Sequence, residues 1–162
     1  MEIEKKYLLR SLPENLDSYP HSTISQGYLN TDPVLRIRQY GEKYILTIKS
    51  SGLMERIEVE KPLSKEEYEE MSVMVKGNLI TKERYLLPLS DYPELKVELD
   101  IFGGKFQGLI VAEVEFPDIE KARSFVAPDY FSREVTDDSR YHNSSLSSMN
   151  SSEIEELLRI SI

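Results

Sequence analysis

The chain of 162 residues contains no cysteine and only two histidines, His21 and His142. Disulfide bonds and thiolate metal sites are therefore excluded, and the scarcity of imidazole argues against a zinc site. No stretch approaches the roughly 20 consecutive apolar residues that cross a bilayer, and the N-terminus lacks the apolar segment of a signal peptide. We expect a soluble, cytoplasmic protein that has no membrane partner.

An excess of basic residues is also missing. The formal net charge is −9, and a surface this acidic repels nucleic acid and anionic lipid. Nucleic acid is therefore not an expected partner, although a local basic site is compatible with this charge. The hydrophobic content of 40% is sufficient for a packed core. We expect one domain over residues 1–162, with the helical and serine-rich segment 139–162 as part of it.

Alternating apolar and polar residues, β-branched side chains and closely spaced turns predict a β-rich first part of the chain. The predicted strands are 1–9, 23–30, 34–40, 43–50, 54–62, 79–89, 95–102 and 106–116. Helical spacing predicts helices over 63–75, 118–126 and 153–162. Ser64 and Glu67 have the spacing of a capping box, Asp118 is a candidate N-cap, and Gly77-Asn78 is the predicted end of the first helix. This mixture of elements indicates an α+β fold.

Charged residues in these strands recur at alternate positions, which places them on one face because side chains alternate across a strand. The sets are Glu2 and Glu4 followed by Lys6, Arg36 and Arg38, Thr47 and Lys49, Glu58 and Glu60 preceded by Arg56, Lys82 and Arg84, Glu98 and Asp100, and Glu113 and Glu115. In any single strand, a solvated outer face is the simpler explanation. Same-sign pairs on one face repel each other, however, and acidic and basic pairs compensate if the strands close around a common axis. The repetition therefore favours a barrel with a charged interior.

Such an interior suggests both a metal ion and a phosphate ligand. Clustered carboxylates bind hard divalent cations such as Mg²⁺ or Mn²⁺ through oxygen, and clustered arginines and lysines bind phosphate. Both sets on one inner wall suit a metal-bound polyphosphate. Phosphoryl-transfer sites use the same arrangement to position phosphates and to neutralise developing charge.

The N-terminal Glu2-x-Glu4-x-Lys6 resembles the E-x-E-x-K motif that defines the CYTH family, the triphosphate tunnel metalloenzymes. The other pairs appear in the order of that family. The segment EVTDDSRYHNSSLS (134–147) resembles its V-T-x-D-x-R-Y-x-N-x-x-L-A tail, with Ser147 where alanine is common. One motif alone is weak, whereas the ordered set is specific. The resemblance implies an eight-stranded, antiparallel, closed β-barrel with helices packed outside, and a divalent-metal-dependent activity on triphosphates.

Carried over by position, the resemblance assigns a role to each set of residues. Glu2, Glu4, Glu113 and Glu115, joined by Asp100, are implied to hold the metal. Lys6, Arg36, Arg38, Lys49, Lys82 and Arg84 are implied to bind the triphosphate. Tyr28 resembles a tyrosine that pairs with Lys49 near the scissile phosphate, so these two are the catalytic candidates. Arg56, Glu58 and Glu60 are expected to be wall residues that balance charge, and Arg140, Tyr141 and Asn143 are candidates for a cap over the tunnel mouth.

These features predict an inorganic triphosphatase that also accepts nucleoside triphosphates. A class IV-type adenylate cyclase or a thiamine triphosphatase would use the same fold, and we find in the sequence neither an adenine pocket nor a thiamine cradle that would decide between them. A non-catalytic polyphosphate-binding module is the alternative of another class, but the presence of every acidic pair favours catalysis. A homodimer is compatible with the resemblance.

Overall fold

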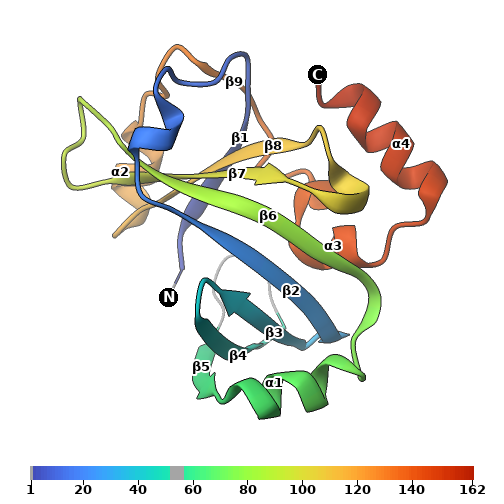
Figure 1. Cartoon of the computed structure of the whole chain (residues 1–162). Coiled ribbons are helices and arrows are strands. Elements are labelled where there is room, and N and C mark those ends of the chain that lie inside the picture. Colours follow the sequence, from blue (N-terminus) through green and yellow to red (C-terminus); the bar gives the residue numbers. More distant parts are fainter. Residues whose placement is uncertain (1, 52–56) are drawn as a thin grey trace.

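The computed structural model describes residues 2–51 and 57–162 of the chain. Within them, nine strands form a single antiparallel sheet in the order β5-β4-β3-β2-β6-β7-β8-β1-β9 (Figure 1). The strands are β1 (Glu4–Leu9), β2 (His21–Thr31), β3 (Val34–Tyr40), β4 (Lys43–Lys49), β5 (Glu58–Leu63), β6 (Lys76–Pro88), β7 (Lys96–Phe102), β8 (Ile110–Glu115) and β9 (Phe131–Glu134). The α+β class and the antiparallel sheet predicted from the sequence are confirmed.

The sheet curls, so that strands far apart in its order approach each other (Figure 1). Lys49 at the end of β4 contacts Glu2, just before β1, although five strands lie between β4 and β1 in the order. Closure of the sheet by hydrogen bonds is not seen in the described residues, and the strands number nine rather than the expected eight. The additional strand, β9, has four residues and pairs with β1 across a break in register, so it extends the sheet without joining β5.

Two helices cover the face of the sheet opposite the charged pairs, which we call the outer face. α1 (Lys65–Ser72) contacts β3, β4 and β5, and α2 (Ile119–Ser124) contributes Ala122 to a buried cluster behind β1, β7 and β8. The predicted helix starts are confirmed, because Ser64 and Glu67 form a capping box and Asp118 accepts the backbone N–H of Lys121 at 2.8 Å. No helix among the described residues is long and apolar enough to span a membrane.

The predicted end of the first helix at Gly77-Asn78 is wrong. α1 ends at Ser72, and both residues belong to β6, which begins at Lys76. Gly77 has a φ of +72°, and a Cβ atom there would collide with the carbonyl oxygen of Ser147. This glycine therefore permits the close approach of the segment that contains Ser147. In a sequence, a glycine needed for close approach cannot be told from a glycine that ends a helix.

The buried cluster on the outer face is aliphatic and aromatic. The ring of Tyr7 in β1 lies 4.8 Å from that of Phe131 and 6.3 Å from that of Phe125, which follows α2 directly. Val97 and Leu99 of β7 have no exposed surface. This layer fixes β1, β7 and β8 from outside, which are the strands whose other face carries the predicted acidic residues.

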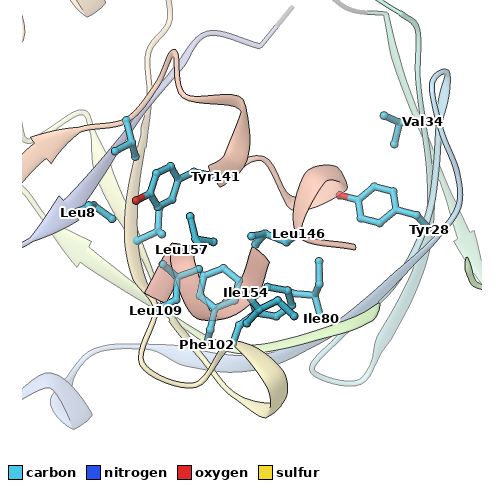
Figure 2. Packing of buried hydrophobic residues seen from close by; sticks show 13 residues of the cluster. Leu8, Tyr28, Val34, Ile80, Phe102, Leu109, Tyr141, Leu146, Ile154 and Leu157 are labelled. Carbon is cyan, nitrogen blue, oxygen red and sulfur yellow. The ribbon is translucent and has the colours of Figure 1, made fainter. Parts of the chain in front are cut away.

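The C-terminal helices lie on the inner face, the one with the charged pairs, contrary to the expectation that the helices pack outside. They are the 3₁₀ turn η3 (Ser139–Tyr141), α3 (Asn143–Ser147) and α4 (Ser151–Ile160); two other 3₁₀ turns, η1 (Leu16–Ser18) and η2 (Gly104–Phe106), lie between strands. Tyr141, Leu146, Ile154 and Leu157 pack against one end of this face (Figure 2). Six strands each contribute an apolar residue there: Leu8, Tyr28, Val34, Ile80, Phe102 and Val111. We call this packed end of the inner face, together with the helices on it, the floor.

Candidate active site

The strand register brings the predicted charged residues to one face. Residues that pair across antiparallel strands point to the same side of the sheet. The pairs that link the strands are Glu4 with Glu115, Lys6 with Glu113, Glu113 with Glu98, Asp100 with Arg84, Lys82 with Ile24, Gln26 with Arg38, Arg36 with Thr47, and Lys49 with Glu58. All predicted site residues within β1, β3, β4, β6, β7 and β8 therefore share the inner face with Tyr28.

Carboxylates hold the bases of β6 tightly. Arg84 makes a two-point contact with Asp100, with distances of 2.7 Å from Nε to Oδ1 and 2.8 Å from Nη2 to Oδ2, and its Nη1 lies 2.7 Å from Glu98 Oε2. Lys82 Nζ lies 2.7 Å from Asp100 Oδ2. Burial alone would raise the pKa of Asp100, but the neighbouring Lys82 and Arg84 hold that pKa below its usual range. Asp100, predicted as a metal ligand, is thus placed as the counter-ion of two buried bases.

A second group of carboxylates, which includes Glu4 and Glu113, is crowded, and nearby bases compensate only part of its negative charge. Burial, and next the charges of Glu113 and Glu2, raise the pKa of Glu4 to about 8. Glu113 is also buried, yet Lys6, whose Nζ lies 3.6 Å away, and the more distant Arg84 hold its pKa below the usual range. Glu113 is therefore ionised at neutral pH, while Glu4 retains its proton.

Oxygen donors under mutual repulsion are the kind of set that a hard divalent cation stabilises. Glu4 pairs with Glu115 across β1 and β8. Glu2 precedes β1 and Glu113 lies in β8, so four carboxylates lie on or beside these two adjacent strands. Within the described residues, no three acidic or histidine side chains converge closely enough to hold an ion without adjustment. The residue types fit Mg²⁺ or Mn²⁺, and binding would require the glutamate side chains to move together.

The two arginines of β3 are held by neutral partners. Arg38 Nε donates to Gln26 Oε1 at 2.7 Å, and Arg36 Nη2 donates to Thr47 Oγ1 at 3.3 Å. Burial, and next the like charges of Arg36 and Arg84, lower the pKa of Arg38 to about 10. Neither arginine contacts a carboxylate among the described residues, and we call this part of the inner face the cationic wall. Gln26 was not among the predicted site residues, although it lies two residues before Tyr28 in β2 and therefore on the same face of the sheet.

The catalytic candidates Lys49 and Tyr28 are not paired with each other in the described residues. Lys49 Nζ lies 3.3 Å from Glu2 Oε1 and 3.4 Å from Oε2. Tyr28 is 3% exposed, and its ring points from β2 toward the C-terminal helices within the floor (Figure 2). Its neighbour Val34, the register partner of Lys49, lies in the same cluster. The predicted pairing of the two residues thus remains a proposal for the ligand-bound protein.

The floor also reaches the charged residues. Lys6 Nζ donates to the carbonyl oxygen of Tyr141 at 3.4 Å, and Lys82 Nζ donates to Asn143 Oδ1 at 3.4 Å. Arg140 instead binds Asp138 at 2.6 Å in an exposed position.

The remaining expected wall residues are less informative. Glu58 and Glu60 are exposed on the edge strand β5, and Arg56 lies outside the described residues.

The fold and the site together define a class of barrel-like proteins: a curled antiparallel sheet whose inner face carries carboxylates, lysines and arginines. The family model of the CYTH domain matches residues 1–147. The chain therefore belongs to the CYTH family, as the resemblance of its motifs implied.

Several known proteins are similar to the chain. It is 38% identical to the inorganic triphosphatase of Nitrosomonas europaea over 149 residues, which cover 90% of this chain and 95% of that protein. It is 33% identical to the inorganic triphosphatase of Acetivibrio thermocellus, over 90% of this chain and 92% of that protein. A crystal structure of an inorganic triphosphatase matches with a TM-score of 0.72 and 34% identity, over 93% of this chain and 96% of that one.

More distant structures share the fold alone. A putative adenylyl cyclase from Hippeastrum, described as having a dominant triphosphatase activity, matches with a TM-score of 0.54 and 18% identity, over 76% of this chain and 83% of that one.

Proposed function

We propose that the protein is a divalent-metal-dependent inorganic triphosphatase that also accepts nucleoside triphosphates. Its relatives in Nitrosomonas europaea and Acetivibrio thermocellus bear the name inorganic triphosphatase. The observation that carries the proposal is the division of the inner face. Arg36 and Arg38 have no carboxylate partner among the described residues, while the carboxylates of Glu4 and Glu113 are crowded enough that one retains a proton. A triphosphate with its cation would compensate both excesses of charge.

The basic residues bind the phosphates in this proposal. Arg36, Arg38 and Lys49 lie on the adjacent strands β3 and β4. The guanidinium groups of the two arginines can each bind two phosphate oxygens and stabilise the charge of the transition state. Lys6, Lys82 and Arg84 complete the set from the opposite side of the inner face. Because Asp100 already compensates Lys82 and Arg84, these two residues contribute less net charge and more fixed geometry.

Glu2, Glu4, Glu113 and Glu115 are the proposed ligands of Mg²⁺ or Mn²⁺. The bound ion would polarise phosphate oxygens and lower the pKa of a water molecule. We assign Asp100 to orienting the bases, because both of its oxygens contact them. Lys49 is proposed to stabilise the charge at the scissile phosphate, and Tyr28 to fix Lys49 once Glu2 has turned to the metal. The lysine and arginine side chains of the inner face are the hydrogen-bond donors, and burial strengthens their electrostatic stabilisation of the transition state.

A phosphate-release assay tests the proposal. Purified protein is supplied with tripolyphosphate, ATP or thiamine triphosphate, each with Mg²⁺, Mn²⁺ or EDTA. We expect release from tripolyphosphate with a metal and none with EDTA. Glu4→Gln should abolish most of the activity, whereas Glu83→Gln, which removes a carboxylate from the outer face, should keep it. Hydrolysis that persists in EDTA would contradict the proposal, and cyclic AMP with pyrophosphate as the products of ATP would show a cyclase instead.

A further inference from the structure

Two buried nitrogen donors on the inner face lack an acceptor among the described residues. They are Nε2 of Gln26 and Nε of Arg36. A buried donor without a partner costs free energy, and native proteins keep few of them. Gln26 pairs with Arg38 across β2 and β3, and Arg36 lies two residues from Arg38, so both donors belong to the cationic wall. An acceptor supplied by a ligand would satisfy both.

The geometry fixes the orientation of the Gln26 amide. Arg38 Nε donates to Gln26 Oε1 at 2.7 Å. A guanidinium group has donors only, so the amide oxygen must face Arg38 and the amide nitrogen must face away from it. The side chain is 0% exposed and cannot turn toward water. Because the bond occupies Nε, the two terminal nitrogens of Arg38 stay without a protein acceptor among the described residues, and a phosphate group can engage both.

The choice of a neutral partner has an electrostatic consequence. Arg84, on β6, contacts Asp100 and Glu98, and these carboxylates compensate its charge. Gln26 contacts Arg38 at the same distance of 2.7 Å but carries no charge. The hydrogen bond to Gln26 therefore orients the Arg38 guanidinium, while its full positive charge remains for an anion.

We propose that Gln26 is a positioning residue for the triphosphate: it orients the Arg38 guanidinium without neutralising it, and its free amide N–H donates to a phosphoryl oxygen. This inference rests on the proposed function and deepens it. It assigns the neutral amide a use that the charged pairs cannot have. A carboxylate at the same position would hold Arg38 more tightly, but it would neutralise its charge and repel the phosphate. An apolar side chain would leave Arg38 without this hydrogen bond.

Two variants and a matched control test the role. Gln26→Glu keeps the shape and adds a charge, and Gln26→Met is close to isosteric and removes the amide. Gln39→Glu adds the same charge to β3 on the outer face, where the Gln39 amide nitrogen donates to the carbonyl oxygen of Gly41. Tripolyphosphate is titrated into each protein by calorimetry in EDTA, so that hydrolysis does not intervene. Thermal unfolding followed by circular dichroism verifies that each variant folds.

We expect both Gln26 variants to bind tripolyphosphate about tenfold more weakly or worse, the effect of losing a hydrogen bond to a charged group. The Gln39→Glu protein should bind like the parent. With saturating Mg²⁺, Gln26→Met should raise KM by a similar factor while kcat changes less, a division that a purely structural defect would not produce.

The outcomes separate this inference from the function on which it rests. If the parent protein neither binds nor hydrolyses tripolyphosphate, the proposed function is wrong. If the parent does both and the two Gln26 variants match it within about twofold in affinity and KM, the function stands and the positioning role is wrong. If Gln26→Glu fails to fold because of its buried charge, the neutral Gln26→Met variant decides alone.

Discussion

Lys49 and Glu2 form an ion pair across the curled sheet, with Nζ 3.3 Å from Oε1 and 3.4 Å from Oε2. The lysine is proposed to contact the substrate and the glutamate is proposed to contact the metal, so each satisfies the other while the ligands are absent. The pair is partly open to solvent, with 16% and 32% of the two side chains exposed. Ion pairs of this kind contribute little to stability.

Replacing either partner should therefore affect catalysis far more than folding. We expect Lys49→Met and Glu2→Gln to change the free energy of unfolding by less than about 1 kcal/mol each. The rate of phosphate release should fall by about two orders of magnitude or more in both, as when a preorganised charge is removed from a reaction site. Urea unfolding and steady-state assays measure the two effects. A large loss of stability with unchanged turnover would contradict both assignments.

Asp100 should show the opposite behaviour. Its side chain is 1% exposed and contacts both Lys82 and Arg84, so Asp100→Ala takes the carboxylate partner from the buried Lys82 and leaves Arg84 with Glu98. Removing one partner of a buried ion pair costs about 3–5 kcal/mol, and we expect a loss of unfolding free energy of this size. Glu98→Gln is the control, because that carboxylate contacts Arg84 alone and its side chain is 31% exposed, so it should cost much less.

The pH dependence of metal binding should reveal Glu4. Its pKa of about 8 in the metal-free protein means that it is largely protonated at pH 7, and a cation must displace that proton. Affinity for Mg²⁺ should therefore rise from pH 6 to pH 9 with release of up to about one proton. Calorimetry in two buffers of different ionisation enthalpy counts the protons. The Glu4→Gln variant should release fewer, and an equal count in both proteins would argue against the assignment.

The same carboxyl should also link folding stability to pH. Because its folded-state pKa lies above the value of 4.5 for an unperturbed glutamate, Glu4 stabilises the metal-free protein fully below that value. This contribution should be lost as the pH rises through about 8. Thermal unfolding in EDTA should thus show a midpoint that falls over this range in the parent relative to Glu4→Gln. Parallel curves for the two proteins would contradict the prediction.

Gly77 should be essential for docking of the C-terminal helices. A Cβ atom at this position would collide with the Ser147 carbonyl oxygen, and the backbone has a φ of +72°. Gly77→Ala should cost more than about 2 kcal/mol of unfolding free energy. Gly41→Ala is the matched control, because Gly41 has a similar positive φ of +59° and the nearest atom to its would-be Cβ is Ser22 Oγ, at an ordinary 3.8 Å. The difference between the two variants measures the steric conflict apart from backbone strain.

The alternation of charges in the sequence was sufficient to place the site residues on one face. β3 runs from Val34 to Tyr40 as predicted, and the register unites the bases and acids because side-chain period in a strand is fixed. The capping box at Ser64 was equally legible, since it depends on residues three positions apart.

What the sequence analysis missed depended on contacts between distant segments. A cap at Arg140, Tyr141 and Asn143 was expected from the sequence, but the C-terminal helices on the inner face were not foreseen. A signal was present: in several strands an apolar residue lies at the next inner position beyond the charged set, as with Leu8 after Lys6 and Ile80 before Lys82. Gly77 was misinterpreted because close approach and helix termination use the same residue. Gln26 was overlooked because a neutral side chain has no place in a pattern defined by charge.

The floor links the packing of the core to the positions of two charged side chains on the inner face. Lys6 donates to the carbonyl oxygen of Tyr141 and Lys82 donates to the side chain of Asn143. The helical segment whose apolar side chains pack in the floor therefore also positions two ammonium groups. A substitution that repacks Leu146 or its neighbours would shift these groups relative to the arginines opposite. We therefore expect a change of packing in the floor to alter both the stability of the protein and the spacing between its cations.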